Sequence, residues 1–75
     1  MARLRPLAYR EVRRRLHAAG FVEVSQRGSH VKFVREVPGR RFVVIVPHHS
    51  DDVPVGTLRS IINQANLTPD EFAGL

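Results

Sequence analysis

The chain of 75 residues contains no cysteine, no tryptophan, and only one methionine and one tyrosine. The lack of cysteine excludes disulfide bonds, thiolate nucleophiles and most zinc sites. It also suits a reducing compartment, so we expect a cytoplasmic protein. No stretch reaches the roughly 18 uninterrupted apolar residues that a membrane-spanning helix needs, so we expect no membrane association.

Lysine is nearly absent, since Lys32 is the only one and the remaining basic residues are arginine. The net charge is +5, and a positive surface attracts phosphodiesters. Arginine binds phosphate through a planar fork, which favours a nucleic-acid partner. A G+C-rich genome that encodes arginine often, together with an ordinary solvated surface, explains the same composition. Charge alone therefore leaves both interpretations open.

The length predicts one domain over residues 1–75, and the apolar fraction of 43% is enough for two packed layers. Apolar residues at three- and four-residue spacing predict a first helix over residues 7–19, which Gly20 ends. Alternating residues predict three strands, at 21–26, 29–36 and 41–46. The valine- and isoleucine-rich third strand is expected to be the best buried. Short turns between the strands predict an antiparallel meander.

Two more helices are predicted after a polar loop at residues 47–54. The first starts near Val55, with Asp52 as its cap. The second follows Thr68-Pro69-Asp70-Glu71, a capping box with proline at the first helical position. The order α-β-β-β-α with a short C-terminal helix predicts an α+β fold. In this fold the helices pack on one face of a three-stranded antiparallel sheet.

Gly28-Ser29-His30 places one imidazole at the start of the second strand, beside a flexible glycine. Histidine exchanges a proton near neutral pH. Alternation puts His30 and Lys32 on the face opposite Val31 and Phe33, about 6.6–6.8 Å apart along the strand. A phosphate fits between them, so the imidazole can move the proton of an RNA 2′-hydroxyl while the ammonium stabilises the phosphorane. The alternative is that His30 only forms a hydrogen bond within the turn.

The adjacent His48 and His49 do not by themselves make a metal site, which usually needs three or four ligands. Asp51 and Asp52 lie nearby, but no wider ligand spacing supports a site, so we expect a surface loop and no metal. One of the two histidines serves as a second proton donor only if the loop folds over the sheet. No phosphate-binding loop, paired-carboxylate site, catalytic serine arrangement or dinucleotide fingerprint is present, and no cofactor is expected.

Several segments, taken in order, resemble HicA-type toxins. They are Gly20-Phe21, Gly28-Ser29-His30 followed by Phe33, Val46-Pro47-His48, Gly56-Thr57-Leu58-Arg59-Ser60-Ile61 and Leu67-Thr68-Pro69-Asp70-Glu71-Phe72. The resemblance covers about residues 12–72. It implies a double-stranded-RNA-binding-like fold and translation-independent cleavage of mRNA. It also implies a type II toxin–antitoxin module in which a HicB-type antitoxin covers the active site, and the family's catalytic histidine matches His30.

The chain departs from many of these relatives at three places. Val31 stands where they have a second histidine, but it points into the core on an alternating strand, so we expect little functional loss. Asp51 and Asp52 replace a loop that is often basic, which weakens the expectation of RNA binding there. Asn66 replaces a usual glycine, and asparagine also accepts left-handed backbone angles.

The sequence therefore predicts a metal-independent endoribonuclease toxin in which His30 is the general acid or base, with mRNA and a HicB-type antitoxin as partners. His48 is the candidate for a second acid or base. The residues expected to bind RNA phosphate are Lys32, Gly28, Ser29, Arg27, Arg10 and Arg14. Two other functions stay open, a non-catalytic module that binds double-stranded RNA and a basic domain that binds an acidic protein. The stoichiometry with the antitoxin also stays open.

Overall fold

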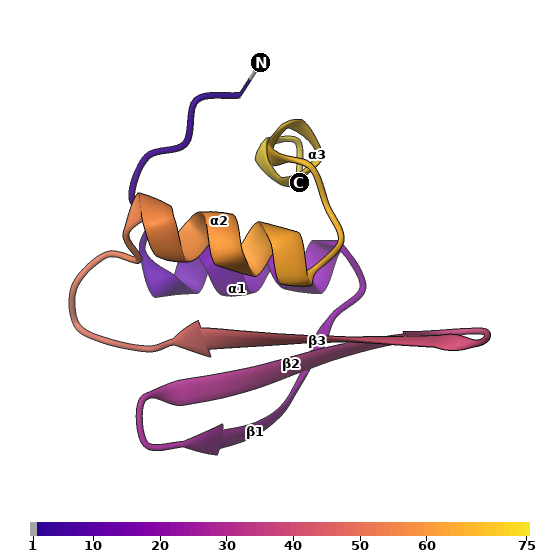
Figure 1. Ribbon diagram of the computed structural model, residues 1–75. Coiled ribbons are helices and arrows are strands. Elements are labelled where there is room, and N and C mark those ends of the chain that lie inside the picture. The colour runs from indigo at the N-terminus through magenta and orange to yellow at the C-terminus, as the bar shows by residue number, and fades with distance from the viewer. Residues whose placement is uncertain (1) are drawn as a thin grey trace.

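The computed structural model describes residues 2–75. Its elements are α1 (Tyr9–Ala18), β1 (Val22–Arg27), β2 (His30–Val37), β3 (Arg40–Pro47), α2 (Val55–Gln64) and α3 (Pro69–Ala73) (Figure 1). This order confirms the predicted α-β-β-β-α arrangement with a short C-terminal helix. Each strand begins and ends within one residue of its predicted bounds.

The strands form one antiparallel sheet in the order β1-β2-β3, with β2 in the centre. Both hairpin turns use a glycine with positive φ, +57° at Gly28 and +76° at Gly39, which side chains rarely accept. β1 contains an irregularity, because its register with β2 shifts between Glu23 and Ser25. Val24 is therefore the extra residue of a bulge, which interrupts the simple alternation expected for this strand.

The helices cover one face of the sheet and leave the other open (Figure 1). Val12 and Leu16, one helical turn apart on α1, are fully buried. From the sheet, the core receives Val31 and Phe33 of β2 and Val44 and Val46 of β3. From the C-terminal half it receives Val53, Leu58, Ile61, Ile62, Ala65 and Phe72.

The prediction that β3 is the best-buried strand is wrong. Val43 and Ile45 are 36% and 38% exposed. β3 lies at one edge of the sheet and alternates its side chains between the covered and the open face, so only half of its apolar residues reach the core. The central strand β2 is the more completely buried one.

The start of α1 and the cap of α2 differ from the prediction, whereas α2 starts at Val55 as predicted. Leu7 forms a two-residue backbone bridge with Val53, so it is extended and α1 begins only at Tyr9. The same bridge fixes the entry to α2, whose N-cap is Pro54 with no side-chain hydrogen bond. Asp52 is therefore not the cap of α2.

The capping box of α3 is confirmed. The Thr68 hydroxyl accepts a hydrogen bond from the Glu71 backbone N–H at 3.1 Å, and the Thr68 N–H donates to the Glu71 carboxylate at 2.8 Å. Asn66, just before this helix, adopts φ +58°, as expected for a residue in a glycine position. No helix within residues 2–75 is long and apolar enough to cross a membrane.

Candidate active site

Cross-strand pairing arranges the side chains of the open sheet face in rows. From one end of the sheet to the other, the rows are Arg27–His30–Pro47, Ser25–Lys32–Ile45, Val22–Val34–Val43 and Glu36–Arg41. The first two rows are cationic and the third is apolar. The open face is therefore divided into a charged end, which holds His30, and an apolar middle.

His30 begins β2 and is exposed, whereas the next residue, Val31, is fully buried on the helical side. The imidazole lines a hollow of about 500 Å³ together with Ser25, Gln26, Arg27, Lys32 and Ile45. The structure thus brings together three predicted site residues, His30, Lys32 and Arg27. No carboxylate lines this hollow, and within residues 2–75 neither Lys32 nor Arg27 forms an ion pair.

The turn that carries His30 is fixed by two hydrogen bonds. The Gln26 side-chain amide donates to the carbonyl oxygen of Gly28 at 3.0 Å. The backbone N–H of His48 donates to the carbonyl oxygen of Ser29 at 2.5 Å. Gly28 and Ser29 therefore help to position the start of β2. An added Cβ at Gly28 would meet no atom within 4 Å, so only the backbone angle requires glycine here.

The His48 imidazole stacks on the Tyr9 ring, with centroids 3.7 Å apart and planes inclined by 9°. Tyr9 begins α1, so this stack lies on the helical side of the sheet. His48 does not line the hollow that contains His30, and the structure does not bring the two imidazoles together. Burial of Tyr9 raises the pKa of its hydroxyl, and the nearby Glu23 carboxylate adds to the increase. His49 is exposed.

Arg10 and Arg14 lie on α1, which covers the face of the sheet opposite His30. The Arg14 guanidinium donates to both carboxylate oxygens of Glu11, at 3.0 and 2.7 Å, and to the Leu75 carbonyl oxygen. These hydrogen bonds, followed by one from Arg15, lower the pKa of Glu11 to about 2. Arg10 is exposed and forms no ion pair in the described part of the chain. Neither arginine shares the hollow with His30.

The apolar row was not anticipated from the sequence. Val34 is only 3% exposed although it faces away from the helices, because Val22 and Val43 stand beside it in the register. Val22, Val24, Val43 and Ile45 are the exposed large apolar residues. Alternation gives the face of each residue, but only the strand register shows that Val34 stands between Val22 and Val43.

No group of three or more histidine, cysteine, aspartate or glutamate side chains is placed to hold a metal ion among residues 2–75. His48, His49, Asp51 and Asp52 follow one another closely in sequence, yet they do not form such a group in this structure. His48 instead stacks on the Tyr9 ring and donates its backbone N–H to the Ser29 carbonyl oxygen.

Comparison with known protein families gives a match that spans most of the chain. The family model for the HicA toxin of bacterial toxin–antitoxin matches residues 9–67. The matched range runs from the start of α1 through α2 and includes the Gly28–His30 turn. No match is found among curated proteins. Because the family model covers most of the chain, the chain belongs to the HicA toxin family, as the toxin of a toxin–antitoxin module.

Proposed function

We propose that the protein is a metal-independent endoribonuclease that cuts mRNA on the open sheet face, with His30 as the general acid or base. The HicA toxin family is known for ribonuclease activity. The observation that carries the proposal is the hollow beside His30. It combines one exposed imidazole with Lys32 and Arg27, and no carboxylate lines it to repel a phosphodiester.

In the proposed reaction, His30 accepts the proton of an RNA 2′-hydroxyl as the 2′-oxygen attacks the adjacent phosphorus. The bond from phosphorus to the 5′-oxygen then breaks, and that oxygen leaves with a proton. The products are a 2′,3′-cyclic phosphate and a 5′-hydroxyl. Lys32 and Arg27 hold the phosphate and stabilise the charge that develops on its oxygens. The Gly28-Ser29 turn positions the imidazole at the edge of the hollow.

His48 is the candidate donor of the proton to the 5′-oxygen. Its ring now stacks on Tyr9, so this role requires the loop after β3 to carry it toward the open face. If His48 stays on Tyr9, His30 returns the proton that it accepted. Arg10 and Arg14, which lie on α1, are assigned a secondary role as contacts for RNA that extends beyond the open face.

We further propose that a HicB-type antitoxin inhibits the toxin by covering the open sheet face. A toxin–antitoxin module requires an antitoxin partner. The exposed Val22 and Val43 lie in the row next to Lys32, and such apolar side chains suit a protein surface better than a polyanion. The cationic row beside them favours acidic residues on the antitoxin, which speed encounter.

The experiment that tests the cleavage chemistry compares two oligonucleotides of one sequence, an RNA and its fully 2′-O-methylated form, in excess EDTA. We expect the RNA to be cut to cyclic-phosphate and 5′-hydroxyl ends, and the methylated form to bind without being cut. Loss of cleavage on chelation would contradict the metal-independent mechanism and make His48, His49 and Asp51 candidate ligands. Binding of both oligonucleotides with no cleavage would instead support the non-catalytic RNA-binding module.

A further inference from the structure

The N-terminal segment, residues 2–7, lies on the side of the helices that faces away from the sheet and runs toward α3 (Figure 1). It is fixed at both ends. The Ala2 backbone N–H donates to the Asp70 carboxylate, and Leu7 exchanges two backbone hydrogen bonds with Val53, at 3.2 and 2.7 Å. Leu4 and Leu7 pack against the core between these points. The backbone of the segment is therefore part of the folded surface beside α3.

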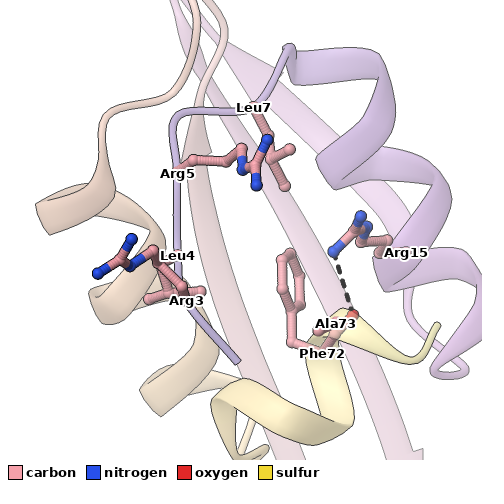
Figure 2. Close-up of a pocket in the computed structure, with 7 residues that line it drawn as sticks. All are labelled: Arg3, Leu4, Arg5, Leu7, Arg15, Phe72 and Ala73. Atoms are coloured by element: carbon pink, nitrogen blue, oxygen red, sulfur yellow. Dashed lines mark hydrogen bonds between the residues drawn. The ribbon is translucent and has the colours of Figure 1, made fainter. Parts of the chain in front are cut away.

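Two hollows lie along this segment, and a third adjoins the second at Arg59 and Pro69. The first, of about 310 Å³, is lined by Arg3, Leu4, Arg5, Leu7, Arg15, Phe72 and Ala73 (Figure 2). The second, of about 670 Å³, is lined by Ala2, Arg3, Leu4, Arg59 and Pro69. The third, of about 220 Å³, is lined by Arg59, Ile62, Asn63, Leu67 and Pro69. Neighbouring hollows share residues, so together they form one extended depression, which we call the arginine groove.

The groove carries positive charge that the described residues do not neutralise. Arg3, Arg5 and Arg59 are exposed and form no ion pair within residues 2–75. The Arg15 guanidinium already has two partners, because it donates to the Glu11 carboxylate at 2.8 Å and to the Phe72 carbonyl oxygen at 3.4 Å.

The acidic side chains of α3 that lie nearest the groove already have partners. Asp70 accepts the Ala2 N–H and Glu71 accepts the Thr68 N–H in the capping box. Within residues 2–75, Arg3, Arg5 and Arg59 form no ion pair with a carboxylate, and Arg15 is the groove arginine that does pair with one, that of Glu11.

The floor of the groove is apolar. Figure 2 shows the guanidinium groups of Arg5 and Arg15 around the space above the Phe72 ring, and the Arg15 guanidinium lies 5.1 Å from the centre of that ring. Phe72 and Ile62 are themselves buried, so the apolar surface open to a ligand is that of the partly buried Leu4 and Leu7 in the first hollow and Leu67 in the third. A ligand that carries both negative charge and small apolar groups can contact the guanidinium groups at the rim of the groove and the apolar side chains of its floor.

From this combination we infer that the arginine groove binds an acidic peptide segment with interspersed apolar side chains, supplied by the antitoxin. Carboxylates would pair with Arg3, Arg5 and Arg59, and apolar side chains would enter the hollows between them. RNA fits less well, because the accessible apolar side chains are aliphatic and Phe72 is buried, so its bases find no exposed aromatic ring to stack on. The groove also lies across the helices from His30, so RNA in the catalytic hollow would have to pass around the molecule. The inference concerns the partner that the family implies and does not depend on RNA cleavage.

The test uses fluorescence anisotropy of a short, labelled peptide that alternates leucine and glutamate, added to the full chain at low salt. The double variant Arg5→Gln/Arg59→Gln removes two charges from the groove. The matched control, Arg40→Gln/Arg41→Gln, removes two exposed charges at the far hairpin. We expect the groove variant to weaken peptide binding about tenfold and the control to change it by less than about twofold. Equal losses in both variants would overturn the proposal, since they would indicate non-specific attraction.

Two further measurements show where on the protein the peptide binds and whether RNA competes for the same surface. In the wild-type protein, the amide resonances of residues 3–7 and 72–73 should shift on addition of the peptide, while those of residues 28–32 should not. This mapping stands even if the groove variant fails to fold. An unlabelled 2′-O-methyl RNA should not displace the peptide, and displacement together with loss of RNA affinity in the groove variant would reassign the groove to RNA. Failure of the cleavage proposal would leave the peptide mapping unchanged, so the two failures are distinguishable.

Discussion

At the scale of single residues, the contrast between His30 and Val31 separates the candidate site from the core. Consecutive strand residues point to opposite faces, and here one is exposed in a cationic hollow while the next is fully buried. A second histidine at position 31 would have to enter the core between β2 and the helices. The open face therefore presents one imidazole at this position, and the strand pattern makes the valine a packing residue.

Glu11 gives a residue-scale prediction about stability. Hydrogen bonds from Arg14, and then from Arg15, lower its pKa from 4.5 to about 2 in the folded protein. The ionised carboxylate thus stabilises the fold above pH 4.5, and this contribution is lost as the pH falls toward 2. Glu11→Gln should lower the thermal midpoint near neutral pH, and the difference from wild type should shrink to nothing on acidification. Thermal melts followed by circular dichroism over this pH range, at low salt, measure the difference in midpoint between the two proteins.

The matched control for this prediction is Glu36→Gln. Glu36 is 74% exposed and its contact with Arg41 is 3.7 Å long, so its loss should change stability less. A Glu11→Gln difference that stays constant from neutral to strongly acidic pH would contradict the role assigned to the ionised carboxylate.

At the scale of elements, β2 carries both the core and the candidate site, and the turn before it sets the position of His30. Gly28 adopts φ +57° in open space, so Gly28→Ala should cost about 1–2 kcal/mol through backbone strain alone. Gly28→Asn should cost less, because asparagine tolerates this conformation. Urea unfolding of the three proteins measures the difference. Equal stability of the alanine variant and the wild type would show that the turn does not require this angle.

The sequence was sufficient to predict most of the elements, because the signals for them are local. Apolar periodicity identifies α1 and α2, the capping box identifies α3, and glycines mark both hairpin turns. The start of α1 was missed because the bridge between Leu7 and Val53 joins segments far apart in the chain. The arginine groove was missed for the same reason, since its residues come from the N-terminal segment, α1, α2 and α3.

The candidate site shows the same division between local and long-range signals. Alternation along β2 is enough to put His30 and Lys32 on one face. The presence of Arg27 in the same hollow follows from its pairing with His30 across the turn. The stack of His48 on Tyr9 joins the end of β3 to the start of α1, and no local pattern predicts it.

At the scale of the whole molecule, the open sheet face and the arginine groove lie on opposite sides of the helices. An antitoxin that covers the sheet face should associate more slowly with Lys32→Glu, because the positive row that attracts its acidic surface is weakened. We expect the association rate to fall about tenfold at low salt, as measured by surface plasmon resonance. The control is Arg40→Glu, which makes the same change of charge at the turn between β2 and β3, away from this row.

Amide exchange of the toxin–antitoxin complex tests the same proposal without a mutation. Protection of residues 27–32 together with loss of cleavage is the expected result. Protection confined to residues 3–7 and 72–73, with cleavage continuing, would rule out inhibition by covering the sheet face. That second pattern would still agree with peptide binding in the arginine groove.

The measurement that tests the central claim most directly is a side-by-side assay of RNA cleavage and RNA binding by the wild-type protein and His30→Ala. His30 is exposed and outside the core, so the variant should keep its thermal midpoint and bind the RNA nearly as well as wild type. Its cleavage rate should fall about 10²–10⁴-fold, the usual contribution of a general acid or base, and growth arrest on expression should disappear. A folded His30→Ala protein that binds RNA and cuts it at the wild-type rate would contradict the claim.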